Sequence, residues 1–292
     1  MNVFIFNSVV DYRWQMLQLR LFERRIAEAS AFFRENNIEP VLIKGWAAAQ
    51  VYPESFQRYF TDIDLLVPPD KYENAVKCLE RFDNKHLIDL HKGARHLDSL
   101  SFENLFANSK IVECGETEIR ILRPEDHLRV LCVHWLNDGG ADREKLWDVY
   151  YAVENRPPDF DWDRCLNVVG EKRKKWIICA VGLAQKYLNL NLENTPLGEI
   201  KIEIPRWLTK TIEKEWQSDA RLLPLEACLN DRRRLWQQIK KRFPPNAVQA
   251  TIEMEGDFDE KSRLKYQLGN VFQRLKPSVR RITKNLLSRR NG

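Results

Sequence analysis

The chain lacks the patterns that would place it in a membrane, a disulfide scaffold or a zinc ribbon. Its longest apolar runs, such as residues 176–183, are far too short to cross a bilayer. The N-terminus has neither a basic segment nor a small-residue cleavage site, so we expect no signal peptide. The six cysteines are scattered and include no Cys-x-x-Cys pair. Together these absences predict a cytoplasmic protein with buried, reduced thiols.

Several common catalytic patterns are also missing. There is no P-loop, no Gly-x-Gly-x-x-Gly and no Ser/His/Asp order, and the helical pair His127 and His134 does not form a His-Glu-x-x-His zinc site. No repeat of 20 to 50 residues recurs, which excludes a solenoid. Any active site must therefore come from another arrangement of residues.

Positive charge is concentrated in the last third of the chain. Residues 201–292 carry 21 Lys and Arg against 11 Asp and Glu, a net charge of +10, whereas the preceding 200 residues carry 26 against 31, a net of −5. Two explanations stay open for this basic third. It contacts a polyanion, or its charges lie on solvated helix faces.

The stretch with the strongest functional pattern is residues 40–67. An apolar strand over residues 38–44 leads to Lys44 and Gly45, then to a short helix, and residues 62–67 form a second strand. Asp62 and Asp64 are two residues apart, so their side chains point to one face of that strand. Adjacent carboxylates repel each other unless a cation or a proton lies between them, and a divalent metal is the simplest partner.

A third acid follows on the next predicted strand. Residues 86–91 alternate as a strand and carry Asp89 and His91. If this strand pairs with residues 62–67, Asp89 joins Asp62 and Asp64 in one metal cluster suited to phosphoryl or nucleotidyl transfer. Asp89 then serves as a ligand and as a base for the attacking hydroxyl. His91 is an auxiliary candidate, although a hydrogen-bonded structural role explains it equally well.

Cationic and small residues around the acids suit a nucleotide. Gly45 lies at a strand-to-helix turn, where the backbone can approach a phosphate, and Lys44 and Arg58 supply positive charge. An ion pair of either cation with the aspartates is the alternative. Thr61 completes the predicted nucleotide-binding group, and Trp46 either stacks on a base or packs in the core.

The rest of the pattern is mostly helical. Residues 11–36 form a long helix with apolar stripes at Trp14, Leu17, Leu21 and at Phe22, Ile26, Ala29, Phe33, and almost only helical periodicity follows residue 123. We predict an α+β protein with a small α/β domain over residues 1–123 and a helical domain over residues 124–292. Residues 92–117 are expected to be irregular apart from one short helix, and a fourth strand is expected at 118–122.

The chain resembles a bacterial nucleotidyltransferase family within the DNA polymerase beta-like superfamily. The resemblance lies in the order of three motifs: Lys-Gly, then Arg-x-x-Thr-Asp-Ile-Asp-Leu-Leu-Val, then Ile-Asp-Leu-His. The matching residues are Lys44, Gly45, Arg58, Asp62, Asp64, Asp89 and His91. The resemblance implies a nucleotidyltransferase palm with a mixed sheet, Mg²⁺, an NTP donor, and Asp62 and Asp64 as metal ligands. One departure is Trp46, where the superfamily has Ser or a second Gly.

From these residues and the resemblance we expect an enzyme, a Mg²⁺-dependent nucleotidyltransferase that moves an NMP from an NTP to an acceptor hydroxyl or phosphate. The acceptor, whether a small molecule, a peptide or RNA, is not specified by the pattern. Two alternatives stay open. Trp46 favours a non-catalytic nucleotidyltransferase fold used as a binding or regulatory module, and the basic last third favours a toxin-type enzyme that modifies tRNA.

Overall fold

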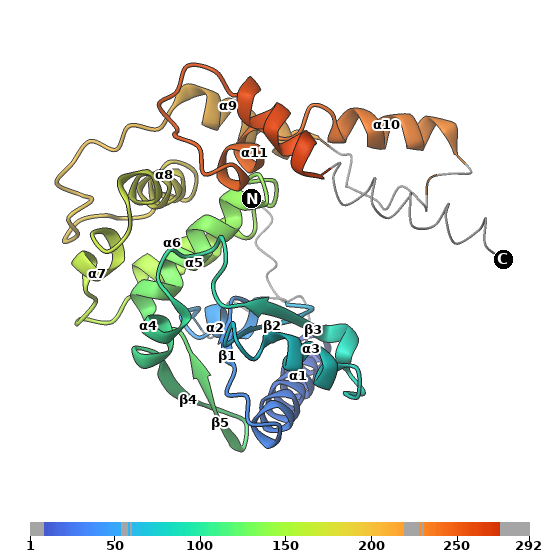
Figure 1. Cartoon of the computed structure of the whole chain (residues 1–292). Coiled ribbons are helices and arrows are strands. Elements are labelled where there is room, and N and C mark those ends of the chain that lie inside the picture. The colour runs from blue at the N-terminus through green and yellow to red at the C-terminus, as the bar shows by residue number, and fades with distance from the viewer. Residues whose placement is uncertain (1–8, 54–57, 59, 219–227, 229–230, 275–292) are drawn as a thin grey trace. The chain divides into compact units, whose positions relative to one another are not determined.

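The structure is a five-stranded mixed sheet with helices, followed by a helical region. The computed structural model describes residues 9–53, 58, 60–218, 228 and 231–274 (Figure 1). The predicted α+β class is confirmed. None of the helices in these ranges has the length and apolar composition needed to cross a membrane. All six cysteines are buried and none forms a disulfide.

The chain divides into two compact units, which we describe separately. The first unit comprises the described residues up to Val130 together with Asn155–Cys165, and the second comprises Leu131–Glu154 and the described residues from Leu166. The predicted domain division at residue 123 stays a prediction, because compactness alone does not show that a segment folds independently.

The sheet of the first unit has the strand order β3-β2-β1-β5-β4. β1 pairs antiparallel with β2 and parallel with β5, β2 pairs parallel with β3, and β4 pairs antiparallel with β5. The short strand β1 therefore lies at the centre of the sheet. The strand bounds are β1 Val41–Ile43, β2 Ile63–Val67, β3 Ile88–Lys92, β4 Lys110–Cys114 and β5 Thr117–Ile121.

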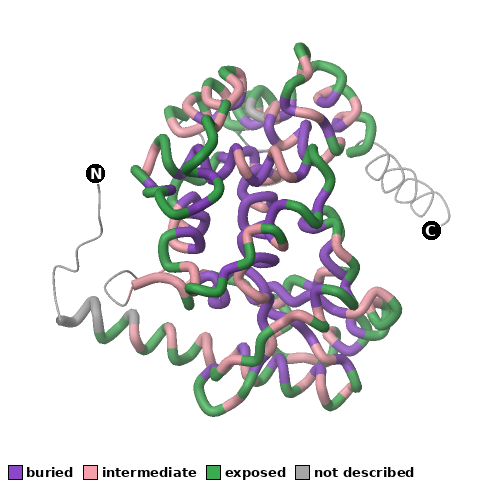
Figure 2. Tube along the Cα trace, turned by 90° about the vertical axis from the view of Figure 1, so that its left-hand side faces the viewer, coloured by how far each residue is buried: buried purple, intermediate pink, exposed green. Residues whose placement is uncertain are grey.

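Both faces of the sheet are covered, because alternate residues of its central strands point to opposite sides. Leu42, Leu65 and Val67 pack in one core with residues of α1, α2 and α3. Val41, Ile43 and Leu66 pack in a second core with residues of α4 and with Val130 in the middle of α5. Every residue of β1 and β2 is buried, and Figure 2 colours the chain by burial. The helices are α1 Val9–Glu35, α2 Gly45–Ala49, α3 Tyr72–Leu79, the 3-10 helix η1 Lys85–Leu87, α4 Phe102–Ala107 and α5 Pro124–Asn137.

A buried ionic cluster connects distant segments of the first unit. Arg129 on α5 donates to Asp98 Oδ2 at 2.8 Å, to Asp126 Oδ1 at 2.7 Å and to the carbonyl of Arg164 at 2.8 Å. Arg164 donates in turn to Asp126 Oδ2 at 2.7 Å. The side chains of Asp98 and Asp126 are 0% exposed and that of Arg129 is 1% exposed, so solvent is excluded. We call these four residues the buried cluster.

The described part of the second unit contains helices and no strand. Three tryptophan indoles donate to loop carbonyls there: Trp176 to Gly256 at 3.1 Å, Trp207 to Phe258 at 3.0 Å and Trp216 to Gly140 at 2.9 Å. Each bond satisfies the polar N–H of an indole ring, which is buried in Trp176 and half-buried in Trp207 and Trp216. The helices are α6 Leu146–Glu154, α8 Glu171–Leu188, α9 Arg206–Trp216, α10 Arg232–Arg242, α11 Ala247–Glu253 and residues 264–274. The short helix α7 Trp162–Leu166 contains the division between Cys165 and Leu166 along the chain.

Two elements were not expected. β4 falls in a region predicted as irregular, because it is an edge strand whose residues are mostly exposed and do not show buried alternation. α11 follows Pro244 and Pro245, and its seven residues are too few to give a periodic signal. The strand predicted at 86–91 begins only at Ile88, after η1. Parts of the helical region predicted after residue 123, among them residues 219–227 and 275–292, lie outside the described residues.

Of the two apolar stripes predicted on the first helix, one is mostly buried and the other is exposed. Ile26, Ala29 and Phe33 are buried, as expected. Trp14, Leu17 and Leu21 are 61%, 58% and 46% exposed, so the prediction that they are buried is wrong. Helical spacing shows which residues share a face, but it does not show how far along the helix the core extends.

Candidate metal and nucleotide site

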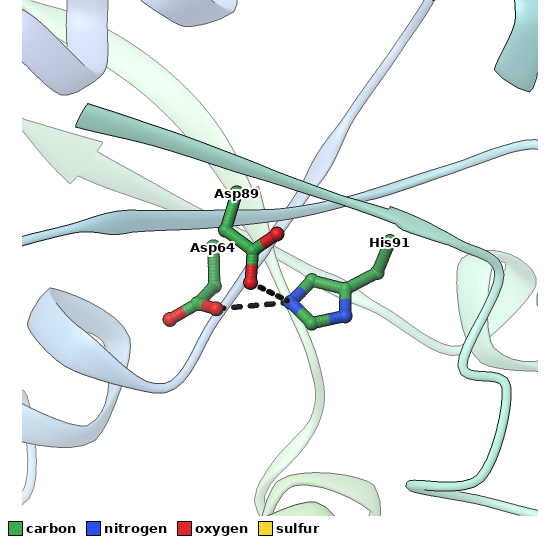
Figure 3. Close-up of side chains that lie close together, drawn as sticks. All are labelled: Asp64, Asp89 and His91. Atoms are coloured by element: carbon green, nitrogen blue, oxygen red, sulfur yellow. Dashed lines mark hydrogen bonds and ion pairs between the residues drawn. The ribbon is translucent and has the colours of Figure 1, made fainter. Parts of the chain in front are cut away.

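The candidate site is built on two neighbouring parallel strands. In the register of β2 and β3, Asp64 lies opposite Asp89, and His91 follows two residues later on the same face as Asp89. Figure 3 shows the three side chains converging from the two strands. The side chain of Asp64 is 5% exposed, that of His91 is 12% exposed and that of Asp89 is 60% exposed. The site is therefore buried on the Asp64 side and reaches solvent at Asp89.

His91 lies between the two carboxylates. Its Nε2 atom is 2.9 Å from Asp64 Oδ1 and 3.3 Å from Asp89 Oδ2. One donor atom from each of the three side chains lies within 4.8 Å of the others. We call Asp64, Asp89 and His91 the candidate metal group.

Lys44 approaches the same group from β1. The strand pairing places Ile43 opposite Asp64, and the next residue, Lys44, directs its Nζ atom to Asp64 Oδ1 at 2.5 Å. The Lys44 side chain is only 8% exposed. The alternative considered for Lys44 from the sequence, an ion pair with an aspartate, is therefore present in the structure.

The backbone at Lys44 and Gly45 makes a tight turn between β1 and α2. Lys44 has a φ of 56° and Gly45 a φ of 34°, a left-handed region that most side chains avoid. The Lys44 N–H donates to His127 Nε2 on α5 at 3.1 Å. This bond satisfies a buried amide at a strained residue and requires the Nε2 atom of His127 to be unprotonated.

The contacts shift each of the three pKa values so that the charged form of the group is favoured. Burial raises the pKa of Asp64, but the hydrogen bond from His91 and the Lys44 charge outweigh it and lower the pKa overall. The hydrogen bond to His91 lowers the pKa of Asp89. Burial lowers the pKa of His91, but its bonds to Asp64 and Asp89 outweigh this effect and raise it. Both carboxylates are therefore stabilised as anions.

The donor set fits a divalent cation. Ligands at about 2.1 Å from an octahedral Mg²⁺ lie about 3 Å apart along each edge, close to the separations of 2.9 and 3.3 Å in the candidate metal group. Two carboxylates supply the oxygen donors that Mg²⁺ prefers. An imidazole nitrogen is better suited to metals such as Mn²⁺ or Zn²⁺.

The other predicted site residues are placed less closely. Asp62 and Thr61 are exposed and precede β2, and Asp62 is not among the residues of the candidate metal group. Arg58 is half-buried and has a partner of its own. Trp46 is 3% exposed, packs in the core beside α1 and donates from its indole to Glu23 at 3.3 Å. The roles of these four residues in metal or nucleotide binding stay predictions.

Sequence reasoning gave no role to His127. It lies 83 residues after Lys44, and only the folded chain brings the two together. The one available signal was general: a buried amide in a tight turn needs an acceptor. His91 was considered only as an auxiliary residue, yet it lies at the centre of the candidate metal group.

Comparison with known proteins finds a family model that is similar to the first part of the chain. Residues 11–86 match the model of an uncharacterised nucleotidyltransferase family. The resemblance inferred from the motifs is confirmed. The matched segment includes Lys44, Gly45, Asp62 and Asp64, and it ends shortly before Asp89 and His91. No curated protein and no solved structure matches the chain.

Proposed function

We propose that the protein is a metal-dependent nucleotidyltransferase that moves an NMP from an NTP to an acceptor hydroxyl or phosphate. The observation that carries the proposal is the convergence of Asp64, Asp89 and His91 on paired strands, beside Lys44. The family match over residues 11–86 supports the same reaction class.

In this proposal Asp64 and Asp89 hold Mg²⁺ and Asp62 adds a ligand from the start of β2. When bound, the metal lowers the pKa of the attacking hydroxyl and neutralises charge on the triphosphate. The lowered pKa of Asp89 makes this residue a better ligand than base. His91 orients the two carboxylates, since its Nε2 atom contacts both.

In the proposed reaction Lys44 interacts either with Asp64 or with the triphosphate. Its ammonium neutralises Asp64 at 2.5 Å, and a triphosphate oxygen offers it a second anion. The turn at Gly45 keeps the backbone free of a side chain beside the site, and Arg58 and Thr61 complete the nucleotide contacts. His127 positions Lys44 through the backbone bond described above.

The variant Asp64→Asn tests the assignment. It keeps the size of the side chain but removes the charge proposed to bind the metal. We expect a loss of about 100- to 1,000-fold in transfer of label from α-labelled NTPs, the range seen for removal of a key electrostatic group. Asp70→Asn is a matched control, because Asp70 is exposed in the same unit and outside the candidate metal group. Equal activity of both variants and the wild type would disprove the proposal.

A second candidate function is a binding or regulatory module without catalysis. Two features favour it: Lys44 already neutralises Asp64, and Trp46, which is buried in the core, stands where the superfamily resembled by the motifs has Ser or a second Gly. Calorimetry with each of the four Mg·NTP complexes separates the two functions. Binding without label transfer supports the module, and transfer to any component of a cell extract supports the enzyme.

We further propose that the protein works in the cytoplasm. NTPs and Mg²⁺ are available there, and six buried cysteines without a disulfide suit a reducing compartment. A tRNA acceptor, suggested by the basic last third, predicts growth arrest on expression and a tRNA shift in gels. If neither occurs, a small-molecule or peptide acceptor is the better choice.

A further inference from the structure

A cavity in the second unit is lined by lysines and by amide and hydroxyl side chains. Lys210 and Lys214 come from α9, Lys240 comes from α10, and residues 244–247 lead from the cavity into α11. The volume is about 780 Å³, within the range of roughly 300–1,000 Å³ that is usual for small-molecule sites. Every lining residue belongs to the second unit, so the cavity exists independently of the candidate metal group.

The three lysines are exposed and lie close to one another around the cavity. Within the part of the chain that the structure describes, no ion pair or hydrogen bond engages the ammonium groups of Lys210, Lys214 and Lys240. Lys210 and Lys214 are one helical turn apart, so their like charges repel each other. Lys240 adds a third positive charge from a different helix. An anion in the cavity would relieve this repulsion.

The carboxylates of Glu213 and Glu215 on α9 accept hydrogen bonds from neutral side chains. Glu215 lines the cavity, but it accepts a hydrogen bond from Asn246 at 3.1 Å. Glu213 accepts from the hydroxyl of Tyr187 at 2.6 Å. With one glutamate against three lysines, the lining keeps a net positive charge.

The floor of the cavity is fixed before any ligand binds. The Asn246 side chain donates to the carbonyl of Gly139 at 3.3 Å and accepts from the amides of Val248 and Gln249 at 2.8 and 3.1 Å. Gln267 donates to the carbonyl of Pro245 at 2.6 Å. A prearranged floor lowers the entropy lost when a ligand binds.

We propose that this cavity binds a small molecule that carries at least two phosphate groups, through Lys210, Lys214 and Lys240. Lysine ammonium groups bind phosphate oxygens as point charges, and three of them from two helices match a ligand with several anionic oxygens. The described lining includes no aromatic ring, which disfavours single-stranded nucleic acid, because such sites stack bases on aromatic side chains. The inference goes beyond the proposed transferase reaction and does not rest on it.

Calorimetry with inorganic pyrophosphate tests the proposal. EDTA is present throughout, so that metal-bound pyrophosphate at the candidate metal group does not contribute. The full-length double variant K210Q/K214Q is compared with K201Q/K261Q, which removes the same charge from exposed lysines of the same unit outside the cavity. We expect the Kd to rise at least about tenfold in the first variant and less than about twofold in the second.

Two further variants test the geometry. K240Q removes the charge from the other helix, and we expect its Kd for pyrophosphate to rise about three- to fivefold. Asp64→Asn should leave this Kd unchanged, which separates the cavity from the candidate metal group. Far-ultraviolet circular dichroism checks that each variant is folded.

Four outcomes would overturn the proposal. In the first, the wild type does not bind pyrophosphate. In the second, the two double variants lose the same affinity for pyrophosphate. In the third, citrate binds as tightly as pyrophosphate, and in the fourth, a single-stranded RNA 12-mer binds through the lysines while pyrophosphate does not bind. The third outcome indicates an unspecific anion site, and the fourth indicates a nucleic-acid surface.

Discussion

The first unit contains two clusters made from the same kinds of residue, and they differ in access to solvent. The candidate metal group with Lys44 combines two aspartates with a histidine and a lysine, and the buried cluster combines two aspartates with two arginines. Asp89 is 60% exposed in the first, whereas Asp98 and Asp126 are 0% exposed in the second.

The cations also differ in how they hold the carboxylates. Arg129 uses a rigid, forked guanidinium to join Asp98, Asp126 and a carbonyl, so its donors are committed to fixed partners. Lys44 places a single point charge on Asp64, and in the proposed reaction a metal ion or a phosphate replaces one partner of this pair. Two aspartates near a cation are therefore not enough to define a functional site: an open side and an exchangeable cation distinguish it from a structural cluster.

The largest expected effect on folding comes from Arg129→Met. This variant leaves Asp98 and Asp126 buried without their main partner, and loss of one member of a buried ion pair typically costs about 3–5 kcal/mol. Urea denaturation measures the change in the free energy of unfolding. Asp64→Asn, measured beside it, should cost much less stability, because asparagine keeps the size of the side chain and its carbonyl oxygen still accepts a hydrogen bond from Lys44. A larger loss in Asp64→Asn would reverse the contrast between the clusters.

The reactivity of Cys165 depends on the state of the buried cluster, because Arg129, Asp126 and Asp98 act on its thiol. Burial raises the pKa of its thiol from 9.0 to about 12. A shift of that size lowers the thiolate fraction near pH 8 by about 1,000-fold, so iodoacetamide should label Cys165 very slowly in the folded protein. Mass spectrometry of the labelled peptide measures the rate. Arg129→Met should increase labelling and Lys44→Gln should not.

The same thiol predicts how stability depends on pH. Below pH 9.0 it is protonated in both the folded and the unfolded state, so it contributes no pH dependence. Between pH 9.0 and about 12 the unfolded chain releases the proton and the folded chain keeps it. The free energy of unfolding should therefore decrease as pH rises through this window. Cys165→Ser, measured in parallel, should show a weaker decrease.

Lys44→Gln tests whether the lysine is exchangeable. Removing the Lys44 charge leaves the Asp64 carboxylate without a neighbouring positive charge. We therefore expect Mn²⁺ to bind about three- to tenfold more tightly, as measured by electron paramagnetic resonance. Label transfer should fall at the same time, because the variant also lacks the cation proposed for the triphosphate. Weaker Mn²⁺ binding would mean that Lys44 organises the group and does not compete with the metal.

Trp46→Phe should have the smallest effect. The ring packs in the core, so we expect a loss of about 1–2 kcal/mol of stability from reduced packing and the lost bond to Glu23. If packing is its whole role, the Kd for Mg·NTP should change less than about twofold. A tenfold weaker Kd at unchanged stability would instead support the predicted contact with the nucleotide.

The sequence was informative where the pattern was local. The α+β class, the strands that carry Asp64 and Asp89, and the turn at Gly45 follow from short-range periodicity and turn chemistry. Burial at the far end of α1 did not follow, because periodicity does not report where a core ends.

Contacts over long separations could not be predicted either. Asp98 and Arg129 are 31 residues apart, and Lys44 and His127 are 83 apart. A single aspartate or histidine on a helix carries no local signal of such a partner. The strand order explains why these contacts have no local signal. β1 pairs with β2 on one side and with β5 on the other, and only the complete sheet determines which residues lie next to each other.

The central position of β1 has a consequence for how the protein matures during synthesis. The three residues of β1 need β5 at 117–121 as a neighbour, and the Lys44 amide needs His127. A ribosome that has released only residues 11–86 has produced the family-matching segment but not the strands and helix that complete its sheet. Pairings over such long separations form late. A fragment that ends before residue 130 should therefore remain sensitive to protease until the following segment is supplied.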